Sequence, residues 1–168
     1  MNIKRLESKD AELYRNLRLK ALKDHPEAFG SSYEEEKNHP IETFADKIHS
    51  NTIFTFGAFD QKELIGIVTL VREVKLKLKH RASIFAMYVL PEKRSLGVGN
   101  ALMTEAIHKA NELSGIEQIY LSVVSTNSPA KKLYASLGFE KFGYEKRALK
   151  LNDQYVDEEH MVLFLNVT

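Results

Sequence analysis

The sequence predicts a mixed α/β fold in which helices cover both faces of one sheet. Segments with alternating or continuous apolar residues, typical of strands, are interleaved with segments whose apolar residues recur every three or four positions, typical of helices. Their order is βαα-βββ-α-β-α-ββ, which is typical of a layered α/β domain. The chain has 168 residues, 43% of them hydrophobic, so it can fill one core. We therefore expect a single domain over residues 1–168.

The N-terminal half is expected to alternate between strands and helices. Asp10 falls in the first turn of an amphipathic pattern that carries Leu13, Leu17 and Leu22, which indicates a helix. The run Gly30-Ser31-Ser32 interrupts the next segment. In order, we expect a strand over 2–6, a helix over 8–25, a loop or broken helix over 29–40, a short helix over 41–49, and strands over 53–59 and 64–74.

The C-terminal half follows the same principles. Gly115 ends one helical pattern, and Pro129 suits the first turn of another, where a missing N–H costs nothing. The residues around Asn152 and Asp153 fit the turn of a closing hairpin. In order, we expect a basic connection over 75–81, a central strand over 84–90, a helix over 98–113, a strand over 119–124, a helix from 129, and hairpin strands over 142–149 and 155–165.

The composition argues against several classes of function. Lys and Arg number 24 against 23 Asp and Glu, so there is no basic surplus for nucleic-acid binding. Without cysteine there is no disulfide, thiolate nucleophile or cysteine-ligated metal, and the six histidines show no metal-binding spacing, so no metal is expected. The chain lacks a signal peptide and an apolar run of ~20 residues, so we expect a cytoplasmic protein without a membrane partner.

A glycine-containing turn, Arg94-Ser95-Leu96-Gly97-Val98-Gly99, separates the central strand from the helix that follows. Free N–H groups at the positive end of a helix form a seat for phosphate oxygens. Gly97 and Gly99 permit unusual dihedral angles and close approach of a ligand, and Arg94 can add a charge-assisted bond. The turn therefore predicts an anchor for a phosphate-bearing cofactor.

The spacing of this turn excludes two common nucleotide motifs. The third glycine of a dinucleotide fingerprint would fall at Leu102, and a triphosphate loop would need Gly-Lys-Ser/Thr where Asn100 follows Gly99. The remaining pattern, R-x-x-G-x-G after a buried strand, resembles the acyl-CoA-binding motif of the GCN5-related N-acetyltransferase (GNAT) superfamily. Glycines also occur in such turns for structural reasons alone, so a second motif is needed.

Residues 127–139 supply that second motif, because N-x-x-A-x-x-L-Y-x-x-x-G-F resembles another signature of the same superfamily at the expected distance. Asn127 or Ser128 can cap a helix there, and Gly138 suits its left-handed end. The chain is thus identified as a member along nearly its whole length. The resemblance implies a GNAT-like central mixed, mostly antiparallel sheet flanked by helices on both faces.

The resemblance also implies transfer of an acetyl group from acetyl-CoA, as co-substrate, to a primary amine in a ternary complex and without a metal. The acceptor would be a small cationic amine or a peptide amino group. Tyr134 matches the position that protonates the departing thiolate, although a packed tyrosine would look the same. The implied cofactor-binding residues are Met87, Tyr88, Val89, Arg94, Ser95, Leu96, Gly97, Val98, Gly99, Asn100 and Asn127; Asn127 is also interpretable as a plain helix cap.

The general base is not identified by any motif. Many members of the superfamily place a glutamate on the central strand, where this chain has Phe85, Ala86 and Met87. Deprotonation through water, or capture of an amine that is already neutral, would need no such residue. The remaining candidates, each of which also fits an ordinary solvated charge, are Glu73, His80, Asp157 and Glu158.

The acceptor site is indicated only by two segments rich in carboxylates and tyrosines, 29–36 and 155–158. Both suit a cationic amine, and both also fit exposed surface. We expect acceptor contacts from Ser32, Tyr33, Tyr155 and Asp157 of these segments. Glu73, from the strand expected over 64–74, is also expected to contribute.

Two other functions fit the same sequence. The fold could serve as a non-catalytic acyl-CoA sensor, because a fold does not determine a function, or as a protein-interaction domain with a purely structural glycine turn. The apolar last strand, 161–165, is compatible with a homodimer interface as well as with a core.

Overall fold

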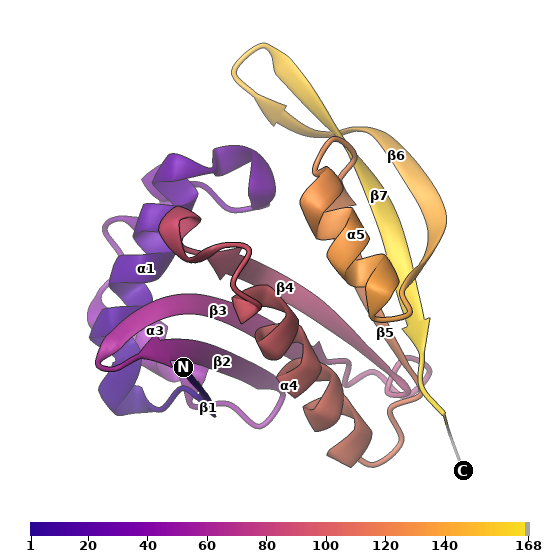
Figure 1. Ribbon diagram of the computed structural model, residues 1–168, viewed down its shortest axis with the longest axis horizontal. Coiled ribbons are helices and arrows are strands. Elements are labelled where there is room, and N and C mark those ends of the chain that lie inside the picture. The colour runs from indigo at the N-terminus through magenta and orange to yellow at the C-terminus, as the bar shows by residue number, and fades with distance from the viewer. Residues whose placement is uncertain (167–168) are drawn as a thin grey trace.

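The computed structural model describes residues 1–166 and contains one seven-stranded sheet between helices (Figure 1). Short 3-10 turns lie at Ser8–Asp10, Pro26–Ala28 and Pro91–Lys93. The other elements are β1 (Asn2–Arg5), α1 (Ala11–Asp24), α2 (Tyr33–Glu36), α3 (Ile41–Ile48), β2 (Ile53–Asp60), β3 (Glu63–Arg72), β4 (Arg81–Val89), α4 (Val98–Glu112), β5 (Gln118–Val124), α5 (Ser128–Ser136), β6 (Glu140–Leu151) and β7 (Gln154–Phe164).

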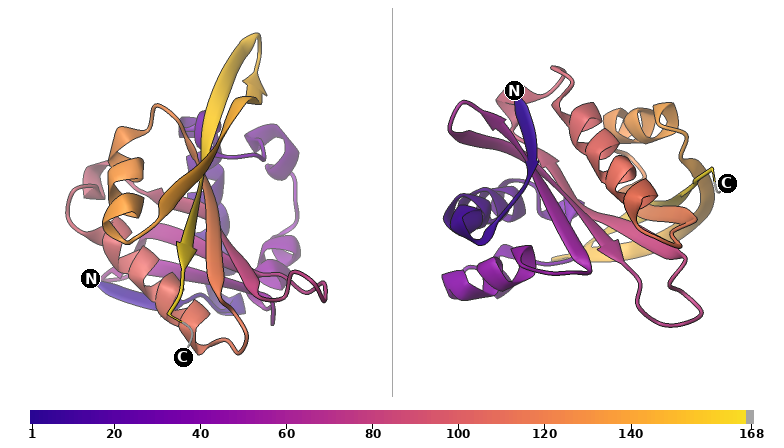
Figure 2. Two further views of the ribbon diagram at one scale, coloured as in Figure 1. Left: turned by 90° about the vertical axis from the view of Figure 1, so that its right-hand side faces the viewer. Right: turned by 90° about the horizontal axis from the view of Figure 1, so that it is seen from below.

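The sheet has the order β1-β2-β3-β4-β5-β7-β6. All neighbouring strands are antiparallel except β4 and β5, which are parallel. Helices α1 and α3 lie on one face and α4 and α5 on the other (Figure 2). We call these the α1 face and the α4 face. Both carry fully buried side chains, such as Phe44 of α3 and Leu102 of α4. This architecture confirms the predicted mixed, mostly antiparallel sheet with helices on both faces.

A bulge in β4 shapes the middle of the sheet. Ile67 of β3 lies opposite Tyr88, whereas Thr69 lies opposite Phe85, so β4 contains an extra residue in this stretch. Ala86 in the bulge has φ +54°, a left-handed conformation that is uncommon for alanine. Strand β5 pairs with β4 only from Arg81 to Ser83. Beyond that point the two strands spread apart (Figure 1).

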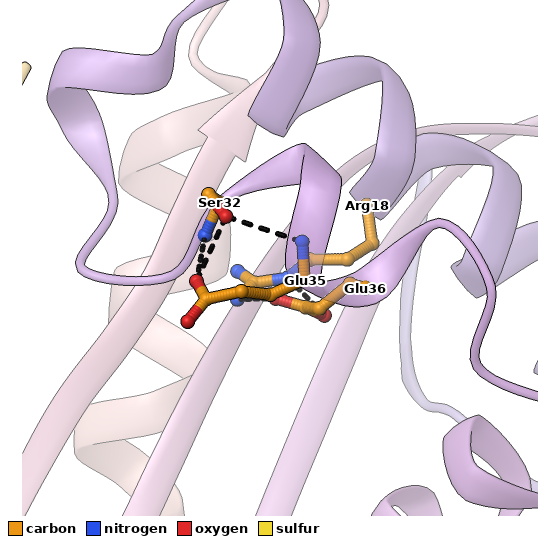
Figure 3. Close-up of polar contacts among 4 residues, drawn as sticks. All are labelled: Arg18, Ser32, Glu35 and Glu36. Carbon is orange, nitrogen blue, oxygen red and sulfur yellow. Dashed lines mark hydrogen bonds and ion pairs between the residues drawn. The ribbon is translucent and has the colours of Figure 1, made fainter. Parts of the chain in front are cut away.

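The segment after α1, expected to be a loop or broken helix, contains the turn Pro26–Ala28 and the four-residue helix α2. A reciprocal capping box begins α2: Glu35 N donates to Ser32 Oγ (3.2 Å), and Ser32 N donates to Glu35 Oε2 (2.9 Å). Glu36 accepts two bonds from the Arg18 guanidinium, with Nε–Oε1 at 3.3 Å and Nη2–Oε2 at 3.0 Å (Figure 3). These contacts hold the segment against α1.

Element ends differ from the sequence prediction where side chains act locally. Residues 8–10, expected to be helical, form a 3-10 turn because the Asp10 carboxylate accepts from Glu7 N (2.9 Å) and pairs with Lys4 (3.3 Å). Strand β4 begins at Arg81 rather than residue 84, since its first three residues carry the pairing with β5.

We expect Glu36→Gln to lower the free energy of unfolding by about 3 kcal/mol, because it leaves the Arg18 charge buried without its partner. The two side chains are 11% and 5% exposed. Urea denaturation followed by circular dichroism measures the change. Asp24→Asn, which breaks the exposed Lys20–Asp24 pair, is the matched control and should leave the midpoint nearly unchanged. Equal midpoints for Glu36→Gln and the wild type would contradict a stabilising role for the buried pair.

Candidate active site

The start of α4 presents unsatisfied main-chain donors. Gly97 is the N-cap residue with φ +81°, and no side chain caps the helix. Ser95 also has a positive φ of +62°. The amide of Ala101 donates to Gly97 O (3.0 Å), so the amides of the preceding turn of helix have no intrahelical partner. An open helix start of this kind favours an anion, as the sequence motif predicts.

Gly99 allows three elements to meet beside that start. A Cβ at this position would lie 3.1 Å from Met87 Cε of β4 and 3.2 Å from Leu133 Cδ2 of α5. Both distances are shorter than ordinary contacts, so a side chain here would press the helix away from the strand and from α5. The glycine thus brings the first motif, the central strand and the second motif into direct contact.

Arg94 braces the end of β4 rather than the open helix start. Its Nε donates to Val89 O (3.0 Å), and Nη2 lies 3.4 Å from His25 Nε2. The guanidinium also lies over the Tyr88 ring, 5.7 Å from its centroid. The Tyr88 side chain packs against His25 and Phe29, and it does not line the cavity described next.

A cavity of about 550 Å³ connects the two faces of the sheet where β4 and β5 separate. From the α4 face it is lined by Met87, Asn127 and Tyr134. On the α1 face, five strand residues on the same side of the sheet line it: Thr55, Thr69, Phe85, Ser122 and Glu158. The covering helices and the segment before α2 add Arg18, Lys47, Phe29, Gly30 and Ser31. The bulge at Ala86, which also lines the cavity, therefore opens a passage through the sheet.

Tyr134 and Asn127 lie together at the α4 end of this passage. The Tyr134 side chain is 7% exposed and meets Phe139 edge to face, with 6.1 Å between ring centroids. Burial raises the pKa of Tyr134 to about 12, so the phenol stays protonated at working pH. Asn127 Oδ1 accepts from Ala130 N (3.3 Å), so Asn127 caps α5 and lines the cavity at the same time.

None of the five expected acceptor residues lines the cavity. Ser32 and Tyr33 are absent from its lining, whereas Phe29, Gly30 and Ser31 of the same segment form part of it. The Ser32 hydroxyl serves the capping box instead. Tyr155 lies near the tip of the hairpin, where Arg147 stacks on its ring at 4.7 Å.

The positions of the four candidate bases relative to the cavity distinguish them. Glu73 and His80 flank the start of β4, at the end remote from the bulge, and neither lines the cavity. The Asp157 carboxylate accepts from Tyr144 Oη (2.5 Å) and Arg147 N (2.8 Å), which bridges a bulge in β6. Of the four candidates, only Glu158 lines the cavity.

Several residues of the cavity lining belong to no sequence motif, notably Arg18, Lys47 and Ser122. Arg18 and Lys47 lie on helices that the sequence predicts, but the face of a helix that meets a cavity depends on the packing of neighbouring elements. Side chains alternate along β5, so Ser122 faces the other side of the sheet from the buried Leu121 and Val123. This alternation is the one feature of the sequence that could have indicated the position of Ser122.

Two further observations concern residues 1–166. No three histidine, aspartate or glutamate side chains are grouped there to hold a metal ion. No helix in this part of the chain is long and apolar enough to span a membrane.

The chain is similar in sequence to known acetyltransferases. The family model described as "Acetyltransferase (GNAT) domain" matches residues 3–160. Over 99 residues the chain is 31% identical to the L-amino acid N-acetyltransferase AaaT of Escherichia coli, an alignment that covers 59% of this chain and 60% of that enzyme. Over 135 residues it is 27% identical to an N-alpha-acetyltransferase of Sulfurisphaera tokodaii, covering 76% and 77% of the two chains.

The fold also matches solved structures. The structure of yncA, a putative acetyltransferase from Salmonella typhimurium with its cofactor acetyl-CoA, superposes with a TM-score of 0.86 at 16% identity. The superposition covers 100% of this chain and 95% of that chain, which shows a shared fold. Because the family model matches nearly the whole sequence, this chain belongs to the GCN5-related N-acetyltransferase (GNAT) family.

Proposed function

We propose that this protein transfers the acetyl group of acetyl-CoA to a primary amine. The observation that carries the proposal is the passage between β4 and β5, with an open helix start on one side and a buried phenol at its α4 end. The coenzyme diphosphate would bind the amides of Leu96 to Asn100, and the pantetheine arm would lie along Met87, Tyr88 and Val89. That edge of β4 has no strand partner beyond Ser83 among the described residues.

The reaction is a direct displacement. The lone pair of a neutral amine forms a bond to the thioester carbon, and the carbonyl oxygen becomes an oxyanion while the nitrogen becomes cationic. The carbon–sulfur bond then breaks and the nitrogen loses one proton to solvent, which gives a neutral amide and CoA thiolate. A free amide N–H of β4 beside the bulge would stabilise the oxyanion. The chain has no cysteine to form an acyl-enzyme, which agrees with a single ternary complex.

The Tyr134 hydroxyl would act on the departing sulfur. Its pKa of about 12 keeps it a donor. Because an ordinary thiol has a pKa of about 8.5, complete proton transfer from this phenol to the thiolate would be uphill. We therefore assign to Tyr134 a hydrogen bond that stabilises the thiolate as the bond breaks, with the proton of the free thiol supplied later by solvent.

The acceptor is a small amine or the amino group of a peptide. The cavity presents both charges, from Arg18, Lys47 and Glu158, and its volume suits a small molecule or a chain terminus. The names of the two relatives above refer to L-amino acids and to N-alpha-acetylation, and both describe α-amino acceptors. Thiol release with spermidine, kanamycin, L-methionine and the tripeptide Ala-Ala-Ala would identify the class.

Two alternatives make different predictions. A non-catalytic acyl-CoA sensor would bind acetyl-CoA but release no thiol with any of these amines. A protein-interaction domain would not bind the coenzyme. A homodimer stays a prediction, which a light-scattering mass would test.

Gly97→Ala should weaken acetyl-CoA binding at least about tenfold, because alanine disfavours the left-handed backbone that aims the helix amides. Isothermal titration calorimetry measures the dissociation constant. Gly115→Ala is the matched control: Gly115 follows the other end of α4, has φ +84°, and likewise has open space around a Cβ. We expect both variants to lose similar thermal stability. Only Gly97→Ala should bind acetyl-CoA more weakly. Unchanged affinity in Gly97→Ala would contradict diphosphate binding at this turn.

Tyr134→Phe should lower kcat about 10²-fold with little change in acetyl-CoA affinity, since the hydroxyl acts on charge that develops only as the thiolate leaves. Steady-state thiol release at saturating acetyl-CoA measures the change. Tyr120→Phe removes a hydroxyl from β5 outside the cavity lining and serves as the control. Equal turnover of Tyr134→Phe and the wild type would reject the role given to this phenol.

A further inference from the structure

We propose that Glu158 is the catalytic base, which binds the ammonium form of the acceptor and takes its proton. This inference rests on the proposed acetyl transfer to an amine. It assigns the one step of that reaction for which the central strand offers no carboxylate, since β4 has Phe85, Ala86 and Met87 beside the passage.

The position of Glu158 in β7 separates it from both neighbouring carboxylates. Glu158 lies on the side of the strand that lines the cavity. Asp157 and Glu159 are each engaged by protein groups, Asp157 by Tyr144 and Arg147, and Glu159 by Lys131 (3.4 Å) and Lys141 (3.3 Å). Within residues 1–166, by contrast, the Glu158 carboxylate has no side-chain hydrogen bond or ion pair, although its strand pairs with β5 and β6. It is also the only carboxylate in the cavity lining, all of which lies in that range. A cationic amine would supply the missing partner.

Neighbouring groups set the basicity of this carboxylate. Partial burial raises the pKa of Glu158, and Glu145, directly opposite on β6, raises it further, while His160 lowers it. Glu145 and His160 are held in place by a chain of contacts: His160 Nε2 lies 2.9 Å from Glu145 Oε2, and His160 Nδ1 lies 2.7 Å from Ser122 Oγ. A carboxylate with a raised pKa is a stronger base than an ordinary glutamate.

The other charged or titratable groups of the cavity come from α1 and α3, which cover the α1 face, and from α5. Arg18 of α1 is already paired with Glu36, so its charge is largely balanced. Lys47 of α3 is exposed, Tyr14 of α1 is buried, and Tyr134 stays neutral at working pH. Among the described residues, neither Arg18 nor Lys47 forms an ion pair with Glu158, so the carboxylate is available to the acceptor.

The proton balance is simple. The ammonium group donates to a Glu158 oxygen, and the N–H bond breaks to leave its electron pair on nitrogen. That pair forms the bond to the thioester carbon as described above. The protonated carboxyl group then returns its proton to water after the amide leaves. An amine that is already neutral in solution does not need this step.

The test compares Glu158→Gln with the wild type from about pH 6 to about pH 9, using thiol release with spermidine, kanamycin, L-methionine and Ala-Ala-Ala. At about pH 7, kcat/KM should fall about 10²-fold. The deficit should shrink toward none as the pH passes the pKa of the acceptor, about 8 for the tripeptide. Glu159→Gln, one residue away on the opposite side of β7, is the control and should show no pH-dependent deficit.

The outcomes separate this inference from the proposed function. Calorimetry with acetyl-CoA verifies that each variant is folded. If Glu158→Gln does not fold, Glu158→Asp replaces it. Because Glu158→Asp keeps the carboxylate, it should retain the pH profile of the wild type. A deficit that is equal at every pH, or no deficit, would overturn the role of Glu158 and leave acetyl transfer intact. A wild type that releases no thiol with any of the four amines would overturn both.

Discussion

The arrangement of the site depends on the extra residue in β4. A parallel pair of strands would normally continue side by side, but the bulge at Ala86 bends β4 away from β5 after only three paired residues. The separation leaves main-chain groups of both strands without strand partners among the described residues, and it opens a passage between the two faces of the sheet. An acyl-CoA arm can satisfy those groups in the way that an added strand would. A left-handed alanine costs free energy that the packing around it must offset, and such strain is most common at functional sites.

The two motifs act as one unit because of this geometry. Gly97 ends the turn after β4 with a conformation that leaves the α4 amides open, and Gly99 allows α4 to pack closely against Met87 and Leu133. Leu133 and Tyr134 belong to the second motif, so the contact places the buried phenol beside the same strand. A substitution at Gly99 would therefore disturb the coenzyme seat and the phenol together. The acceptor side is built separately, from the segment held by Arg18 and Glu36 and from β7.

Much of this arrangement could be predicted from the sequence. The order of the elements, the glycine turn at the start of α4 and the helix of the second motif all follow from local patterns, and the structure agrees with each of them. Local patterns fail where one residue changes the register. The side of the sheet that Glu158 faces is set by the pairing of β7 with β5, which places Val124 opposite Glu158, and no local pattern reveals that long-range pairing. Arg94 likewise follows its carbonyl partner on Val89, which only the folded chain brings near.

The most direct test of the account is amide hydrogen exchange with and without saturating acetyl-CoA. If the gap beside the bulge holds the coenzyme, exchange should slow in peptides that cover residues 84–89 and 96–100, while the loop over 75–80 at the opposite end of β4 keeps its rate. Calorimetric binding of acetyl-CoA without slower exchange in either of those two segments would contradict the account.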